Sequence, residues 1–170
     1  MSRSTTTRNP YEVVQAVAAG VGRLVAGGLT PEQREDQLDQ LADLYAEDTD
    51  VRHPFSPAGD APLRTRRQVR DHFAAAGAQL HGVERFAPVD PVVHTTGDPE
   101  VVVFEYTRAI RARGHDFTVP CIYVVRVRDG RIVESRDYDD HVALAGGLGR
   151  LDALASASKQ RWRASAHEEW

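Results

Sequence analysis

The chain has 170 residues, of which 41% are hydrophobic and 27% are charged, a composition typical of a globular protein with a substantial core. Its net charge of −4 offers no basic surface for nucleic acid, and no apolar run approaches the ~18 residues that a membrane span requires. The single cysteine, Cys121, excludes an internal disulfide, and the first nine residues lack an apolar signal-peptide core. These features predict a cytoplasmic protein with neither nucleic acid nor membrane as a partner.

Three helix-start signals lie in the first half of the chain. Each is a capping residue followed three positions later by Glu or Gln, the pairs being Asn9 and Glu12, Thr30 and Gln33, and Thr65 and Gln68. Apolar residues at helical spacing follow every start, and Gly27-Gly28 ends the first helix. The apolar stripe of the second helix runs as far as Tyr45. The pattern therefore predicts three amphipathic helices.

Two further strands are expected around the third helix, the first of them short. Residues 51–55 alternate in polarity, which places His53 on one face with Val51 and Phe55. Residues 83–96 favour a strand that is broken by its two prolines, Pro88 and Pro91.

Three long strands follow, at residues 101–112, at 117–128, and from Arg131 to an acidic group that includes Asp137. Asp129-Gly130 is the strongest two-residue hairpin signal between them, because both positions of such a turn need a positive φ. A short amphipathic helix is expected near Leu151. Helices followed by an antiparallel meander indicate an α+β fold with helices on one sheet face. We expect one domain over residues 1–170, with a polar tail at 1–8, a core at roughly 10–155 and a helical tail at 150–170.

Counting residue pairs outward from Asp129-Gly130 assigns the side chains of the sheet to its two faces. One face carries five candidate site residues: Glu105, Thr107, Ile122, Ser135 and Asp137. The other carries Tyr106, Tyr123 and Arg136. Both faces are substantially apolar in the middle strand, so both should be covered, one by the helices and the other by a second protomer or the C-terminal tail. The sequence thus favours a homodimer.

Asp137 and Glu105 are the leading catalytic candidates. On the count above they lie diagonally across three strands with Cα atoms roughly 11–12 Å apart, so both could reach one ligand. Apolar neighbours would raise the pKa of such a carboxyl and suit it to general acid or base catalysis. Alternatively, Asp137 lies at the wet rim of the sheet and Glu105 pairs with an arginine such as Arg111.

The remaining candidates each have a plain structural alternative. His53 could enter the pocket as a proton shuttle or be a core histidine. Tyr45 could donate a hydrogen bond to a substrate, and Phe55 and Phe73 could form pocket walls with Ile122, but all could be ordinary core residues. His72 and His81 do not share a helix face, so no metal site is expected. No motif for phosphate binding or zinc hydrolysis is present, and we expect no cofactor.

Three segments carry a family resemblance: LADLYAEDTDVRHPF, PLRTRRQVRDHF and DGRIVESRDYDDHVAL. With the strands between them, the chain resembles the SnoaL-like polyketide cyclases of the ketosteroid-isomerase and nuclear-transport-factor superfamily. The resemblance implies a cone-shaped, curved antiparallel sheet wrapped around the N-terminal helices, with an apolar pocket at its open end and a homodimer formed through the outer sheet face. In the cyclases an acid on the last strand acts as general acid or base, and Asp137 matches that position. Other members open epoxides with an Asp-Arg-Asp set, for which the sequence alone gives no clear counterpart.

Three functions follow as hypotheses. The first is a cofactor-free cyclase or isomerase that acts on an apolar, carbonyl-bearing small molecule such as a polyketide or steroid-like compound. In it, Asp137 moves a proton, with Glu105 or His53 as partner and with Thr107 and Ser135 contacting substrate. The second is a non-catalytic small-molecule-binding or dimerisation module of the same fold, because this fold hosts many functions. The third is an epoxide hydrolase.

Overall fold

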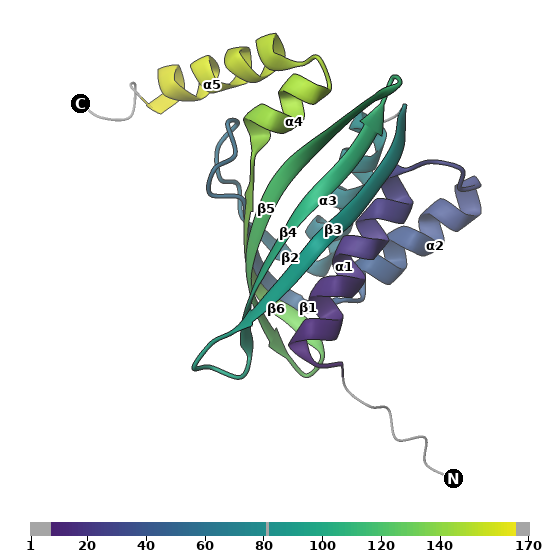
Figure 1. The fold of residues 1–170 in the computed structure, drawn as a ribbon. Coiled ribbons are helices and arrows are strands. Elements are labelled where there is room, and N and C mark those ends of the chain that lie inside the picture. Colours follow the sequence, from purple (N-terminus) through teal and green to yellow (C-terminus); the bar gives the residue numbers. More distant parts are fainter. Residues whose placement is uncertain (1–7, 81, 166–170) are drawn as a thin grey trace.

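The computed structural model describes residues 8–80 and 82–165. In it, three N-terminal helices lie on one side of a twisted sheet, and two further helices follow the last strand (Figure 1). All but Arg8 of the expected polar tail lies outside the described residues, as do His81 and residues 166–170 of the expected helical tail. In the described part of the chain, no helix has both the length and the apolar character needed to cross a membrane.

The three predicted helix starts are confirmed. Helices α1 (Pro10–Val25), α2 (Pro31–Ala42) and α3 (Arg66–Gln79) all begin with a capping box in which the cap side chain and the third helical residue bond to each other's backbone N–H. In α1, for example, the N–H of Glu12 donates to Oδ1 of Asn9 at 2.9 Å. These local bonds satisfy backbone donors that the first helical turn leaves without partners.

The expected end of the second helix was wrong. Helix α2 stops at Ala42, and Tyr45 is the first residue of strand β1 (Tyr45–Arg52). The reason lies far along the chain, because the N–H of Ile132 donates to the carbonyl of Leu44 at 2.8 Å and draws this segment into the sheet. β1 pairs in parallel with the last strand of the sheet. The sheet was expected to be antiparallel throughout, and this pair is the exception.

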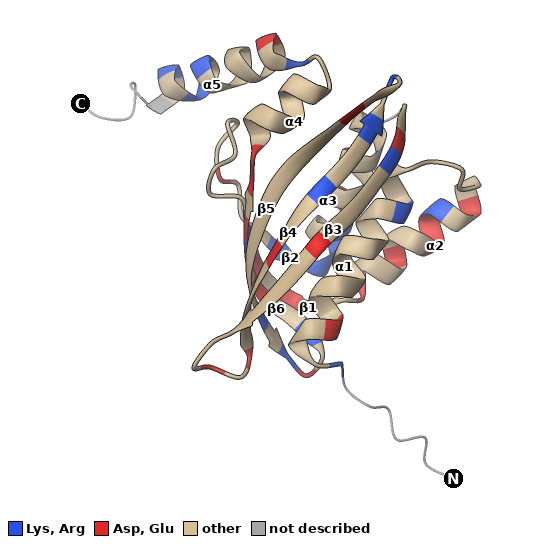
Figure 2. Cartoon of the chain, viewed as in Figure 1, with Lys and Arg blue, Asp and Glu red and all other residues tan. Residues whose placement is uncertain are grey.

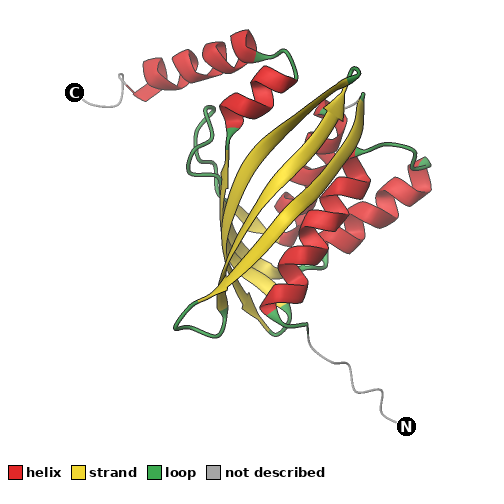
Figure 3. Cartoon of the chain, in the orientation of Figure 1, coloured by secondary structure: helices red, strands yellow, loops and turns green. Residues whose placement is uncertain are grey.

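Six strands form a single curved, unclosed sheet (Figure 3). Their order is β2-β1-β6-β5-β4-β3, where the remaining bounds are β2 (Leu63–Thr65), β3 (Val83–Thr95), β4 (Val101–Ala112), β5 (His115–Arg128) and β6 (Arg131–Asp139). β3 runs through Pro88 and Pro91 without the expected break. It can do so because it is an edge strand, and a register shift between Val89 and Val92 accommodates Pro91.

The two long hairpins determine which side chains of β4, β5 and β6 lie on each face of the sheet. Asp129 and Gly130 have φ values of 51° and 73°, which confirms the predicted two-residue turn. The preceding hairpin is tighter than expected, because Ala112 pairs with His115 rather than Phe117. That difference is two residues, an even number, so every side chain of β4 and β5 stays on the face that counting predicts.

A β-bulge in the final hairpin reverses the prediction for most of β6. Pairing starts at Arg128 with Arg131 as expected, but the register shifts by one residue after Val127. As a result Tyr123, not Ile122, lies opposite Asp137. A one-residue shift moves every later side chain to the other face. Asp137 therefore shares its face with Tyr106 and Tyr123, whereas Glu105 points to the opposite side.

The concave face of the sheet, to which Asp137 now belongs, packs against the N-terminal helices. The fully buried side chains come from both layers and include Val13, Leu24, Leu38, Leu41, Val69, Phe104, Ile110, Val119, Val125 and Ile132. α1 approaches β3 so closely that a Cβ atom at Gly22 would lie 2.5 Å from the carbonyl oxygen of Phe86. Two further helices, α4 (His141–Gly147) and α5 (Leu151–Ser165), follow β6 in place of the one short helix expected.

Candidate functional site

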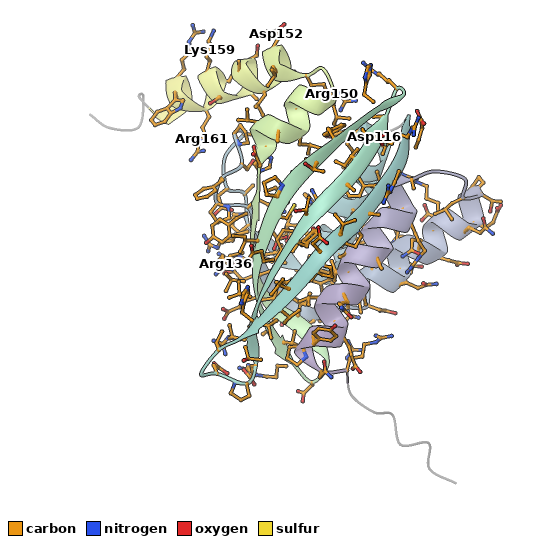
Figure 4. All side chains as sticks on the ribbon, in the orientation of Figure 1. Asp116, Arg136, Arg150, Asp152, Lys159 and Arg161 are labelled. Carbon is orange, nitrogen blue, oxygen red and sulfur yellow. The ribbon has the colours of Figure 1, made fainter. Side chains whose placement is uncertain are left out.

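A cavity of about 490 Å³ lies between the concave sheet face, α1, α3 and the α4–α5 segment. Its apolar walls include Val17, Ala18, Val21, Phe73, Leu80, Phe86, Leu144, Leu148 and Leu154. Its polar lining consists of Tyr45, His53, His72, Gln79, Tyr106, Arg108, Tyr123, Asp137, Asp139, His141 and Arg150. A mostly apolar cavity with a few convergent polar groups is the usual form of a small-molecule site. Figure 4 draws the side chains on the ribbon and labels Arg150, one of the residues that line the cavity.

Asp137 lies in this cavity on β6 and is only 9% exposed. The hydroxyl of Ser135, two residues before it on the same strand face, donates to its Oδ1. Nε2 of His53 lies 3.8 Å from its Oδ2. Burial and the negative charge of Asp139 raise the pKa of Asp137 to about 7, although Ser135 and two nearby arginines oppose the shift. Asp137 can therefore exchange a proton near neutral pH.

Asp139 lies two residues further along the same face and behaves in the opposite way. Burial opposes its ionisation and is the largest single influence, but Arg108 and hydrogen bonds from its neighbours outweigh it, so the pKa of Asp139 falls below its usual value. Nη2 of Arg108 lies 3.3 Å from its Oδ1, and the hydroxyl of Tyr123 donates to the same oxygen at 3.2 Å. One cavity thus holds two carboxyls with opposite pKa shifts.

Arg108 on β4 joins these groups. It is 7% exposed, its guanidinium lies 4.8 Å from the ring centre of Phe86, and its Nη2 donates to the hydroxyls of Tyr106 at 2.8 Å and Tyr123 at 2.7 Å. Its Nε and Nη1 have no hydrogen-bond partner among the described residues, although Arg108 lines the cavity. Those N–H groups are available to an oxygen of a bound molecule.

Three histidines, His53, His72 and His141, also line the cavity. The rings of His53 and His72 stack with centres 4.8 Å apart. Burial lowers the pKa of His53, so its ring is neutral at neutral pH. Nε2 of His141 is buried and has no partner within residues 8–80 and 82–165. In that same part of the chain, no three His, Cys, Asp or Glu side chains are grouped to hold a metal ion.

Several predicted site residues lie together in the cavity. Asp137, His53, Tyr45 and Phe73 all line it, and Ser135 contacts Asp137 from a fully enclosed position on the same strand face. The ring of Tyr45 packs against Phe73 with centres 5.9 Å apart, and burial raises the pKa of Tyr45 well above its usual value. Tyr45 reaches the cavity from β1 rather than from the expected helix.

The prediction that Glu105 shares a ligand with Asp137 was wrong. Glu105 lies on the outer face of β4 and accepts a hydrogen bond from, or ion-pairs with, Nε2 of His94 at 3.1 Å. Thr107 and Ile122 lie on the same outer face, where Ile122 is 43% exposed. The bulge in β6 is the reason, since it moved Asp137 away from the side of these three residues.

Phe55 is also misplaced. It is 68% exposed and its ring packs on Tyr138, at 5.1 Å between centres, outside the cavity. The alternation expected over residues 51–55 stops because β1 ends at Arg52 and the N–H of His53 donates to a carboxylate oxygen of Asp60 at 3.0 Å. The chain then turns away, so that His53 lines the cavity and Phe55 does not.

Four further residues of the site were not predicted from the sequence: Arg108, Tyr106, Tyr123 and Asp139. One signal was available, because strand alternation places Arg108 on the face of Tyr106, and an arginine between apolar positions of a central strand calls for a buried partner. Its partner could not be named from sequence, since Asp139 comes inward only through the bulge.

Comparisons with known proteins agree with the fold. The model of the SnoaL-like domain matches residues 31–135, more than half of the chain. A protein of ketosteroid isomerase-like fold from Catenulispora acidiphila, solved with trimethylamine, has a TM-score of 0.59 and 22% identity over 84% of this chain and 95% of its own. A putative polyketide cyclase from Streptomyces antibioticus has a TM-score of 0.60 and 22% identity, covering 84% and 99%. A putative isomerase from Bacillus subtilis has a TM-score of 0.63 and 18% identity, covering 84% and 97%.

No curated protein matches the chain significantly. The curved sheet with its helix-covered cavity defines a protein of ketosteroid isomerase-like fold. Within that class, the chain belongs to the SnoaL-like domain family.

The ionisation of Asp137 makes the stability of the protein depend on pH. The folded state holds this proton up to about pH 7, whereas an unfolded aspartate releases it near pH 3.9. The free energy of unfolding should therefore fall as pH rises between these values and then level off. In Asp137→Asn this pH-dependent decrease in the free energy of unfolding should be absent. Its size in the parent is on the order of 4 kcal/mol, at ~1.36 kcal/mol for each tenfold change in proton affinity. Urea unfolding of both proteins from pH 4 to pH 8 measures the decrease.

Asp36→Asn is the matched control, because Asp36 is exposed on α2. The difference between Asp137→Asn and the parent should grow with pH, while the difference for Asp36→Asn should stay nearly constant. Parallel curves of unfolding free energy against pH for all three proteins would contradict a raised pKa of Asp137 in the folded state.

Proposed function

We propose that this protein is a cofactor-free enzyme that moves a proton next to the carbonyl group of an apolar small molecule, as a cyclase or isomerase of polyketide-like or steroid-like compounds would. The observation that carries the proposal is the pair of carboxyls in one cavity with opposite pKa shifts. Pairs of this kind separate the group that exchanges a proton from the group that stays charged.

Asp137 is the group that exchanges the proton. With a pKa near 7 it is present in both its acidic and basic forms at neutral pH, which is the condition for efficient general acid–base catalysis. The neutral ring of His53, 3.8 Å away, lies where it can receive or return that proton. Tyr45 and Phe73 supply the surrounding apolar wall.

Arg108 donates hydrogen bonds to the carbonyl oxygen of the substrate. When a proton leaves the carbon next to a carbonyl, negative charge develops on the carbonyl oxygen, and fixed N–H donors stabilise it. Nε and Nη1 of Arg108 are such donors, and the guanidinium is held in place by Tyr106, Tyr123 and Asp139. Because Asp139 already balances its charge, Arg108 polarises a neutral carbonyl without requiring an anionic substrate at this end of the cavity.

Deuterium uptake from D₂O tests the proton transfer without knowledge of the complete reaction. A β-diketone and a β,γ-unsaturated ketosteroid are incubated with the parent and with Asp137→Asn, and exchange beside the carbonyl is followed by mass spectrometry. The loss of a general acid–base group typically costs roughly 10²–10⁴-fold in rate, and we expect a loss in that range. The parent rate should follow a single ionisation near pH 7.

Asp36→Asn again serves as the control and should exchange at the parental rate. An Asp137→Asn rate within about threefold of the parent would exclude the catalytic role of Asp137. Binding of the ketones by both proteins without exchange in either would instead identify a non-catalytic binding module.

Epoxide hydration is the second candidate, and one specific observation favours it. The structure brings Arg108 against Asp139 and beside Asp137, which supplies an Asp-Arg-Asp set on the cavity wall. In such a set one carboxylate activates a water while a protonated carboxyl delivers a proton to the epoxide oxygen, and the opposite pKa shifts suit this division.

Isotope labelling separates this candidate from the first. With an apolar epoxide such as styrene oxide in water enriched in oxygen-18, an epoxide hydrolase forms a diol that carries one labelled oxygen, at a rate above the uncatalysed reaction. A diol rate equal to that of buffer alone would remove this candidate and leave the carbonyl chemistry untouched.

We also propose that the protein forms a homodimer through the outer sheet face. Ile122 and Val92 are 43% and 47% exposed there, and Val103 and Val124 are half-buried beside them. Apolar surface of this kind on a sheet face favours a partner protein. The hydrophobic contribution of its burial is about 25 cal/mol for each Å² removed from water.

A charge at the centre of that face should disrupt the association. Ile122→Glu should shift the protein to a monomer in sedimentation velocity experiments, because a carboxylate would have to be buried without a partner. Gln40→Glu, which adds the same charge to an exposed position of α2, should leave the dimer intact. A parent that sediments as a monomer at every concentration would contradict the proposal.

A further inference from the structure

The rim of the cavity carries a second positive charge. Leu80 at the C-terminal end of α3, Leu148 after α4, and Leu154 on α5 line the cavity there, and Arg150 lies between the last two helices. Figure 4 labels Arg150 at the turn that joins α4 and α5. α4 itself carries no Lys, Arg, Asp or Glu along its length (Figure 2). Arg150 is therefore a charged group beside an otherwise apolar helix.

Arg150 differs from Arg108 in how its charge is balanced. Arg108 has Asp139 at 3.3 Å, whereas Arg150 has no carboxylate partner among the described residues. Among the described residues its side chain forms one hydrogen bond, from Nη2 to the main-chain oxygen of Gln79 at 2.9 Å. That bond holds the guanidinium at the end of α3 and leaves Nε and Nη1 without a partner in the described part of the chain. Arg150 as a residue is half-buried, and a guanidinium in this state suits an anion, since it binds carboxylates through two N–H groups at once.

The deep end of the cavity disfavours an anion. Asp139 lies there as a carboxylate and neutralises Arg108, and Asp137 is close by. A ligand carboxylate placed among these groups would meet one or two negative charges at short range, which is unfavourable. The cavity lining also includes the side chains of Leu80, Leu144, Leu148 and Leu154. The two arginines of the lining thus select for different ends of an elongated ligand.

We propose that the cavity binds an elongated amphiphile whose carboxylate pairs with Arg150 at the rim while its apolar body extends inward toward Arg108. The placement of a reacting carbonyl at the deep end rests on the proposed function, but the preference for a carboxylate at the rim does not. The substrate class is then an acid with a long apolar body and an uncharged carbonyl at the far end.

Binding of simple amphiphiles tests the rim preference directly. Decanoate and decan-1-ol share an apolar chain and differ at one end, and isothermal titration calorimetry at pH 8 measures both. We expect the parent to bind decanoate about tenfold more tightly than decan-1-ol, as one charge-assisted pair can provide. Arg150→Gln should abolish this preference, and Arg150→Lys, which keeps the charge, should retain most of it.

Arg163→Gln is the matched control, because it removes the same charge from an exposed position on α5. It should leave the preference unchanged. Equal affinities for the two ligands, binding of neither, or a decanoate preference that survives Arg150→Gln would each overturn the proposal. The assay reads binding alone, so a failure here leaves the proton exchange by Asp137 standing, and a failure of that exchange leaves the rim preference standing.

Discussion

The buried ion pair between Arg108 and Asp139 fixes two charges of the cavity beside Asp137. Burying two charges costs several kcal/mol for each ion, and the cost is offset only when good geometry and further hydrogen bonds accompany the pair. Here Tyr106 and Tyr123 supply those bonds, and the ring of Phe86 covers the guanidinium. The pair keeps Asp139 charged inside a low-dielectric cavity.

That fixed negative charge has a direct consequence two residues away. Asp137 is buried on the same strand face, and a second carboxylate beside Asp139 is disfavoured by both desolvation and repulsion. Arg108 lowers the pKa of Asp137 less than burial and Asp139 together raise it. The result is one carboxylate that positions a cation and one carboxyl that holds a proton near neutrality. Both carboxyls belong to aspartates on one face of β6. Their different environments, and not the residue type, therefore cause their opposite pKa shifts.

Local sequence signals predicted much of the fold. Capping residues such as Asn9 and Thr65 gave the helix starts, and Asp129-Gly130 gave the final hairpin, because both depend on bonds within a few residues. Tyr45 was misassigned to a helix because its place in a strand depends on pairing with Ile132, which is distant in the sequence. Long-range pairing cannot be read from a local pattern.

The site was less predictable for a related reason. Asp137 was identified, but three of its expected companions on the sheet were wrong, because a single extra residue in β6 decides which face Asp137 joins. A bulge of this kind leaves no clear mark in the sequence around Val133. Once its position is known, Asp137, Asp139 and Tyr123 fall on one face, and Arg108 follows from its alternation with Tyr106. Glu105, Thr107 and Ile122 then belong to the outer surface.

We expect one carboxyl of the cavity to titrate near neutral pH while its neighbour does not. Carboxyl ¹³C chemical shifts of aspartate, followed by NMR from pH 3 to pH 9 in the parent and in Asp137→Asn and Asp139→Asn for assignment, measure both groups separately. We expect a midpoint for Asp137 near pH 7 and a midpoint for Asp139 below the usual range of an aspartate, ~3.9. Midpoints near pH 4 for both carboxyls would contradict the account.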